Sequence, residues 1–208
     1  MLSEREGSLN QRQELEGVSR IKVGVIGPTN IRKLNQLTGL PVRFLQERAR
    51  TVGKILAETD CDLWINSDQG MLVGVARGYK ESDGKKVVLL YPDKGEPWPK
   101  QHSTPYMRYA DELRKEENWF WSNYNVIALP DICVCVGRSA GASSELAYIK
   151  WDHQFKRGNL KKLVAVRELL IDGILPPEIE VDIRDKVQYI DKAEDLKDFL
   201  VSFKSQHP

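Results

Sequence analysis

The stretch CVCVGRSAGASSELAYIKW, residues 133–151, combines an apolar run, a turn of small residues and a helix-like segment. The apolar run ends at Val136, and after the small residues a lone acid, Glu145, opens the helix-like part. A buried strand that passes through glycine into a helix is typical of parallel α/β sheets, whose ligands bind beyond the carboxyl ends of the strands. The stretch therefore predicts a fold class and the place of a binding site.

Strand-like and helix-like segments alternate along the rest of the chain. Apolar, β-branched runs predict strands at 20–27, 61–66, 85–92, 161–169 and 187–190, and another inside 126–137 after a Pro-Asp break. Helices are predicted at 41–59, 71–82, 107–121, 143–155 and 192–204, joined by loops that include 28–40 and 93–106. Because apolar strands separated by helices usually lie parallel with both faces covered, we expect a single-domain α/β fold. Its core would be a doubly wound, Rossmann-like parallel sheet with helices on both faces.

The overall composition is that of an ordinary globular chain. Its 208 residues suit one domain, and residues 1–19 are expected to form a polar, flexible arm before a nucleotide-binding domain at 20–208. Lys and Arg number 31 against 30 Asp and Glu, so the net charge of +1 gives no strong signal for nucleic acid. No apolar run approaches the roughly 18 residues that cross a membrane, and the polar N-terminal segment lacks a secretory core. We therefore expect a cytoplasmic protein without a membrane partner.

The cysteines and histidines form no metal-binding pattern. Cys133 and Cys135 alternate on one predicted strand, so both side chains point to the same face of the sheet. Their C-x-C spacing differs from that of common zinc and redox sites, and small buried hydrophobic side chains are the expected role. The three histidines are scattered along the chain, so we expect no metal site.

Three predicted strand ends share glycine and small polar residues. They comprise Gly27, Pro28, Thr29 and Asn30, then Ser67, Asp68, Gly70 and Met71, then Gly137, Ser139, Gly141, Ala142 and Ser143. Glycine lets the backbone approach a ligand, and the free N–H groups of a helix start suit an anion such as phosphate. We therefore expect these segments to form a phosphate-sized hollow. The chain has neither G-x-G-x-x-G after its first strand nor a Gly-Lys-Ser/Thr loop, which disfavours an NAD dehydrogenase or a P-loop enzyme.

Glu145 has two interpretations. An acid early in a helix is favourable by itself, by about 0.3–1 kcal/mol, so a capping role explains it without any ligand. Alternatively, the carboxylate lies beside a bound sugar, where it orients hydroxyls or stabilises positive charge as an N-glycosidic bond breaks.

Together, the three strand ends resemble a superfamily with a Rossmann-like nucleotide-binding fold. It includes the lonely guy phosphoribohydrolases, the lysine decarboxylase-like proteins and the molybdenum cofactor carrier proteins. The resemblance covers about residues 20–203 and rests on the order of the three motifs. In the hydrolase signature Pro-Gly-Gly-x-Gly-Thr-x-x-Glu, Gly141 and Glu145 match, whereas Ala142 replaces the threonine and one glycine of the pair is missing.

The hydrolases also carry an arginine on the helix before this strand, and it works with the glutamate. Here residues 118–125 contain no arginine; Arg108, Arg114 and Arg138 are the available substitutes, and none of them matches the pattern. Loss of such an electrostatic group often costs a factor of 10²–10³ in rate. The resemblance therefore implies the fold more strongly than the hydrolase activity.

The resemblance leaves two functions open. One is a carrier or sensor that binds a nucleotide or a phosphorylated, nucleotide-like cofactor, and the other is a hydrolase of nucleoside 5′-monophosphates with Glu145 and Arg138 as catalytic residues. In both cases the partner is a small phosphorylated ligand, no cofactor is required beyond a possible bound nucleotide or phosphate, and a homodimer or higher homo-oligomer is expected.

Two aromatic segments also allow two interpretations. The cluster Trp119, Phe120, Trp121 and Tyr124 is typical of core or dimer-interface packing, and stacking on a base is the alternative. The segment 97–99, Pro-Trp-Pro, is either a stiff surface connection or a loop that folds over a ligand.

Overall fold

The computed structural model describes residues 20–95 and 99–207. The predicted flexible arm at 1–19 lies outside the described residues, as do Pro97 and Trp98 of the predicted Pro-Trp-Pro loop.

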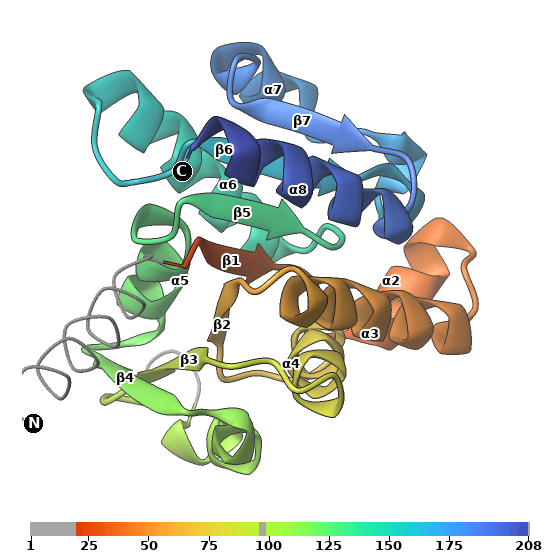
Figure 1. Ribbon diagram of the computed structural model, residues 1–208. Coiled ribbons are helices and arrows are strands. Elements are labelled where there is room, and N and C mark those ends of the chain that lie inside the picture. The colour runs from red at the N-terminus through yellow and green to blue at the C-terminus, as the bar shows by residue number, and fades with distance from the viewer. Residues whose placement is uncertain (1–19, 96–98, 208) are drawn as a thin grey trace, which may run out of the picture.

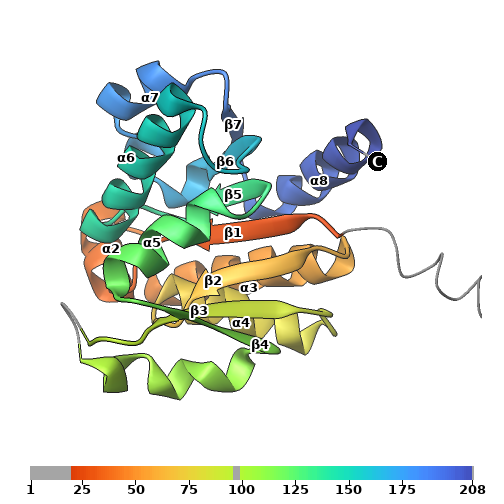
Figure 2. The ribbon, with the colours of Figure 1, turned by 90° about the vertical axis from the view of Figure 1, so that its left-hand side faces the viewer.

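Seven parallel strands form one sheet in the order β4-β3-β2-β1-β5-β6-β7 (Figure 1). The strands are β1 (Lys22–Ile26), β2 (Asp62–Asn66), β3 (Val87–Pro92), β4 (Glu112–Glu116), β5 (Ile132–Cys135), β6 (Lys162–Val166) and β7 (Val187–Ile190). Figure 2 shows them following one another from β4 at one edge to β7 at the other. The order reverses between β1 and β5, which is the switch point where doubly wound sheets bind ligands.

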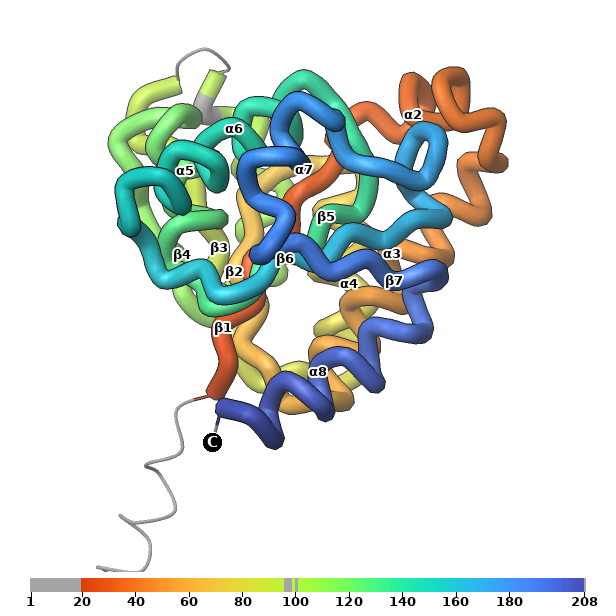
Figure 3. Tube along the Cα trace, turned by 90° about the horizontal axis from the view of Figure 1, so that it is seen from above, coloured from red at the N-terminus to blue at the C-terminus, as the bar shows by residue number. Residues whose placement is uncertain are grey.

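Helices cover both faces of the sheet, as the sequence predicted. They are α2 (Ile31–Thr38), α3 (Val42–Glu58), α4 (Met71–Glu81), α5 (Trp119–Ala128), α6 (Ala140–Phe155), α7 (Pro177–Ile183) and α8 (Leu196–Gln206). Figure 3 shows α5, α6 and α7 on one side of the strands and α3, α4 and α8 on the other. The predicted fold class, a single α/β domain with a Rossmann-like parallel sheet, is confirmed.

The strands are apolar on both faces because each face has its own core. Val23 and Val25 of β1 pack in the core of α3, α4 and α8, whereas the adjacent Ile26 packs in the core of α5, α6 and α7. Cys133 and Cys135 both belong to the second core and are fully buried, which confirms that they share one face. Burial raises the pKa of the Cys135 thiol to about 12, so it acts as a small hydrophobic side chain.

Two predicted elements are wrong. The charged segment 107–121 is not one helix: it holds the end of a 3₁₀ helix, η2 (Thr104–Tyr109), then β4, then the start of α5, whose first turn the Asn118 side chain caps. As an edge strand, β4 has a single neighbour, and its charged residues prevent further strand pairing. The segment 28–40, predicted as a loop, contains α2, which Asn30 caps at its start and Gly39 ends in the left-handed conformation.

No helix among the described residues has the length and apolar character needed to cross a membrane.

Candidate functional site

A pocket of about 640 Å³ lies beyond the carboxyl ends of β1, β2 and β5. The three segments that the sequence singled out meet around it, although they are far apart in the chain. Of the predicted site residues, those that line the pocket are Gly27, Pro28, Thr29, Asn30, Asp68, Arg138, Ser139, Gly141, Ala142, Ser143 and Glu145. Its volume falls in the range of about 300–1,000 Å³ that small-molecule sites occupy.

Four predicted site residues, Ser67, Gly70, Met71 and Gly137, do not line the pocket. Ser67 is fully buried, and its hydroxyl donates to the Ser103 carbonyl at 2.7 Å. In this structure the four residues lie behind the pocket lining, and their contact with a ligand stays a prediction.

Gly70, Met71 and Gly137 hold the turn at Pro28 from behind. Gly70 has a φ of +68°, and a Cβ there would lie 2.4 Å from the Thr29 carbonyl oxygen. The Met71 amide donates to the Pro28 carbonyl at 3.0 Å. Gly137 has a φ of +129°, and a Cβ there would lie 2.9 Å from the Pro28 ring. Only glycine permits the close approach of Gly70 and Gly137 to the turn at Pro28. Together with the hydrogen bond from Met71, this approach fixes the wall of the pocket.

Two helices begin at the pocket and direct their positive ends toward it. The Asn30 side chain accepts a hydrogen bond from the Lys33 amide at 3.0 Å, and the Ser139 hydroxyl accepts one from the Ala142 amide at 3.1 Å. These caps satisfy one first-turn amide in each helix. The amides of Ala140 and Gly141 at the start of α6 have no acceptor within their own helix and are placed to bind an anion.

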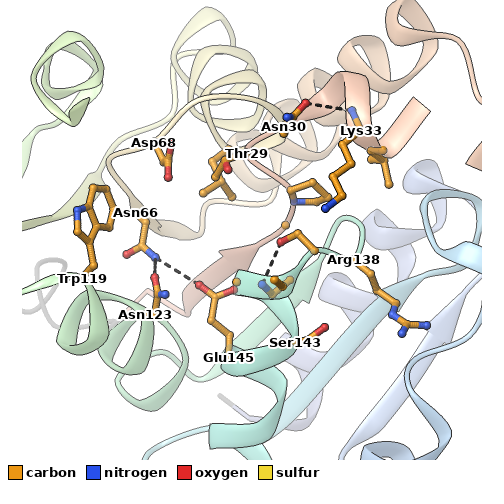
Figure 4. Close-up of a pocket in the computed structure, with 18 of the residues that line it drawn as sticks. Thr29, Asn30, Lys33, Asn66, Asp68, Trp119, Asn123, Arg138, Ser143 and Glu145 are labelled. Atoms are coloured by element: carbon orange, nitrogen blue, oxygen red, sulfur yellow. Dashed lines mark hydrogen bonds between the residues drawn. The ribbon is translucent and has the colours of Figure 1, made fainter. Parts of the chain in front are cut away.

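Two cationic side chains, Lys33 and Arg138, line the same end of the pocket. Figure 4 shows the Lys33 side chain running from α2 toward the pocket, and Arg138 pointing away from Glu145. The Arg138 Nε is buried and has no hydrogen-bond partner in the described part of the chain. The other arginines considered as substitutes lie elsewhere: Arg114 pairs with Glu116 at 2.6 Å, and the Arg108 guanidinium lies over the Tyr109 ring.

The other end of the pocket is buried and polar. Glu145 is 5% exposed, and in residues 20–95 and 99–207 its carboxyl has no ion-pair partner. Its Oε1 lies 3.4 Å from Nδ2 of Asn66, which also donates to Oδ1 of Asn123 at 2.9 Å (Figure 4). Burial raises the pKa of Glu145 well above its ordinary value, and the charge of Asp68 adds to this. Burial therefore favours the uncharged form of this carboxyl over the ionised form.

The capping interpretation of Glu145 is wrong. Ser139 caps α6, and the first turn of that helix contains no acid, because Glu145 lies in its second turn. The carboxyl faces the pocket instead (Figure 4).

The connection between β3 and β4 packs at the edge of this buried end. The ring of His102, in the short 3₁₀ helix η1 (Lys100–His102), lies 2.9 Å from Oδ1 of Asp68 and packs edge-on against Trp119, with ring centroids 6.0 Å apart. Burial raises the pKa of Asp68, and hydrogen bonds from the Gln69 amide and His102 oppose the rise. The His102 ring thus contacts both Asp68 and Trp119.

Trp119 and Phe120 of the predicted aromatic cluster both line the pocket, which a purely structural role for the cluster did not anticipate. Trp119 is buried, whereas Phe120 and Trp121 are exposed; Trp121 packs edge-on against Tyr124, with ring centroids 5.8 Å apart. Trp119 and Phe120 therefore offer flat apolar surface to a ring system.

Several lining residues were not predicted: Lys33, Leu34, Leu37, Asn66, Leu72, Asn123, Ala140 and Ile171. Lys33, Leu34 and Leu37 belong to the unpredicted α2, whose cap signals Asn30 and Gly39 were present in the sequence. Nothing in the sequence marked Asn66 and Asn123 as a pair, because they lie on different elements. Among the described residues, no group of three His, Cys, Asp or Glu side chains lies close enough to hold a metal ion.

No family model matches the chain, and no curated protein matches its sequence. Solved structures of similar fold do exist. A molybdenum cofactor carrier protein from Chlamydomonas reinhardtii aligns with a TM-score of 0.60 and 16% identity, over 90% of this chain and 98% of that one. A molybdenum cofactor binding protein from Rippkaea orientalis aligns with a TM-score of 0.65 and 14% identity, over 90% and 99%. DNA processing protein A from Helicobacter pylori, described by its single-stranded DNA binding mode, aligns with a TM-score of 0.56 and 14% identity, over 89% and 82%.

These similarities correct one expectation. The prediction that no cofactor is required is wrong on this comparison, because two of the similar proteins are described as carrying or binding a cofactor. At 14–16% identity the likeness concerns the fold. At that level the predicted Rossmann-like fold is confirmed, because the molybdenum cofactor carrier and binding proteins share it over 90% of this chain.

Proposed function

We propose that the chain binds and carries a phosphorylated, nucleotide-like cofactor in the pocket at the ends of β1, β2 and β5. The open end supplies helix amides, Lys33 and Arg138 for a phosphate group. The buried end supplies aromatic surface and uncharged hydrogen-bonding groups for a ring system. The molybdenum cofactor, a phosphorylated pterin, has both a phosphate and a ring system. The descriptions of two proteins of similar fold name this cofactor, which supports it as the ligand.

One observation carries the choice of a carrier over a hydrolase. Glu145 is buried without a cationic partner among the described residues, and its raised pKa favours the uncharged carboxyl. A carboxylate that stabilises a ribosyl cation has to be ionised when the N-glycosidic bond breaks. The uncharged group serves instead as a hydrogen-bonding partner for a bound ligand.

Binding and product release, measured on the same purified protein, test this proposal. Equilibrium dialysis against isolated molybdenum cofactor and against AMP should show binding, and chromatography of the AMP sample should show no free adenine or ribose 5-phosphate. The Glu145→Gln variant should still bind, because an amide can replace an uncharged carboxyl as donor and acceptor.

Two outcomes would overturn the proposal. Release of adenine that disappears in Glu145→Gln would establish the phosphoribohydrolase, whereas a failure to bind either ligand would exclude the carrier.

The expected homo-oligomer stays a prediction, and we assign it to the outer face of α5 and α6. Apart from Phe120, which lines the pocket, these helices carry three large aromatic side chains that are 48–59% exposed: Trp121, Trp151 and Phe155. Burial of these side chains against a second copy of the chain would remove apolar area from water. The molecular mass of the protein in solution gives its oligomeric state and tests this assignment. The cytoplasmic location also stays a prediction.

A further inference from the structure

The buried end of the pocket holds an unsatisfied hydrogen-bond acceptor. Asn66 is 4% exposed, and its Oδ1 has no partner among residues 20–95 and 99–207. Its Nδ2, in contrast, is used, because it donates to Asn123 at 2.9 Å. Buried polar atoms nearly always have partners, so an orphan acceptor that lines a cavity points to a ligand that donates to it.

The Glu145 carboxyl next to Asn66 is also nearly free. Its hydrogen bond in the described part of the chain is the long contact of 3.4 Å with Asn66 Nδ2. A carboxyl that carries its proton offers one donor and one acceptor, and the Asn66 oxygen adds a second acceptor. The two side chains, which both line the pocket, thus carry one donor and two acceptors.

The complement of this set is a ring edge with one acceptor and two donors. A carbonyl, a ring N–H and an exocyclic amine in a row have this pattern, which guanine and the pterins share as a 2-amino-4-oxopyrimidine edge. Trp119 and Phe120 line the same pocket and suit a flat heterocycle.

We propose that Asn66 and Glu145 select a heterocycle whose edge carries an exocyclic amine beside a ring N–H and a carbonyl. This inference rests on the proposed function, because it names the ring class of the same phosphorylated ligand. The amine is the group that the Asn66 oxygen requires. Hypoxanthine lacks that amine, and adenine lacks both the carbonyl and the ring N–H, so either ring leaves a buried polar group unpaired.

Three nucleotides with the same ribose phosphate test the inference by calorimetry. GMP should bind the full-length protein at least about tenfold more tightly than IMP or AMP, because a site built to hydrogen-bond one group discriminates strongly against ligands without it. The comparison of GMP with IMP isolates the amine and needs no variant.

Variants assign the selectivity to residues. Asn66→Leu, which keeps the size of the side chain, should make the affinities for GMP and IMP equal. Glu145→Gln should keep the preference for GMP, whereas Glu145→Leu should reduce it. Lys33→Ala is the matched control at the other end of the pocket. It should reduce the affinities for GMP, IMP and AMP by the same factor.

The possible failures are distinguishable. Equal and measurable affinities for GMP, IMP and AMP would overturn this inference and leave the proposed function intact. A GMP preference that survives Asn66→Leu would also overturn it. If none of the three nucleotides binds, and inorganic phosphate does not bind either, the proposed function itself fails.

Discussion

The two ends of the pocket handle charge in opposite ways. At the open end, Lys33 and Arg138 accompany the starts of α2 and α6, so several positive groups face one region. At the buried end, Glu145 and Asp68 both have raised pKa values, because burial disfavours their charged forms. Neutral amides and aromatic rings surround them.

The difference follows from access to water. Lys33 at the open end is exposed, so solvent stabilises its charge until an anion replaces the water. At the buried end Glu145 is only 5% exposed and has no countercharge among the described residues, so burial favours its uncharged form. One cavity thus combines an anion site with a site for a neutral ring, and three substitutions test this division.

The largest effect is expected for Gly70→Ala, because Gly70 supports the turn at Pro28 and Thr29 between the two ends. The added Cβ would lie 2.4 Å from the Thr29 oxygen, on a residue with a φ of +68°. The free energy of unfolding should fall by about 2–5 kcal/mol, and ligand binding should be lost at both ends. Chemical denaturation measures the loss of stability.

Gly39→Ala is the matched control for that experiment. Gly39 has a similar φ of +73°, but an added Cβ would meet no atom within 4 Å. It should cost only the conformational strain, about 1–2 kcal/mol, and leave binding unchanged. Equal losses in the two variants would show that contact with the Thr29 turn is unimportant.

The second prediction concerns Glu145→Gln and the pH dependence of stability. In the unfolded chain the carboxyl ionises near its ordinary pKa of 4.5, whereas the folded protein keeps the proton to higher pH. The folded state therefore binds more protons in this window, and the wild type loses stability as pH rises from about 4.5 to the folded pKa. The glutamine variant has no such loss.

The free energy of unfolding of the variant should therefore equal that of the wild type near pH 4. It should then exceed the wild-type value by about 1.4 kcal/mol more for each pH unit across that window. Urea denaturation of both proteins between pH 4 and 8 measures the difference in the free energy of unfolding. Asp68, whose pKa is also raised, changes the stability of both proteins in the same direction. A difference that does not change with pH would mean that Glu145 is ionised in the folded protein.

The smallest effect is expected for Lys33→Glu at the open end. Reversing this charge should weaken the binding of inorganic phosphate by about tenfold, which corresponds to about 1.4 kcal/mol, and should leave the stability nearly unchanged. Arg32→Glu makes the same charge change on α2 but outside the pocket. It should weaken the binding of phosphate by less than about threefold at physiological salt. Equal effects of the two substitutions would indicate a diffuse field instead of a defined anion site.

The sequence predicted the anion end better than the buried end. Glycine, serine and a following helix are local signals of a phosphate site, and 137–145 carried them all. The α2 contribution was missed, although Asn30 and Gly39 marked the limits of the helix, because its eight residues are shorter than the window over which helical periodicity is recognised. β4 was missed because a charged edge strand lacks the apolar pattern by which strands are recognised.

The sequence by itself determined the alternation of strands and helices, the buried cysteine face and the strand ends at which the pocket forms. These features depend on side-chain pattern and backbone preference, which act over short distances along the chain. Only the tertiary structure decided that Asn66, Asn123 and Glu145 meet, that Arg138 points away from them, and that the Glu145 carboxyl favours its uncharged form. The physical reason is that burial and hydrogen-bond partners depend on elements distant in sequence, and no local pattern records them.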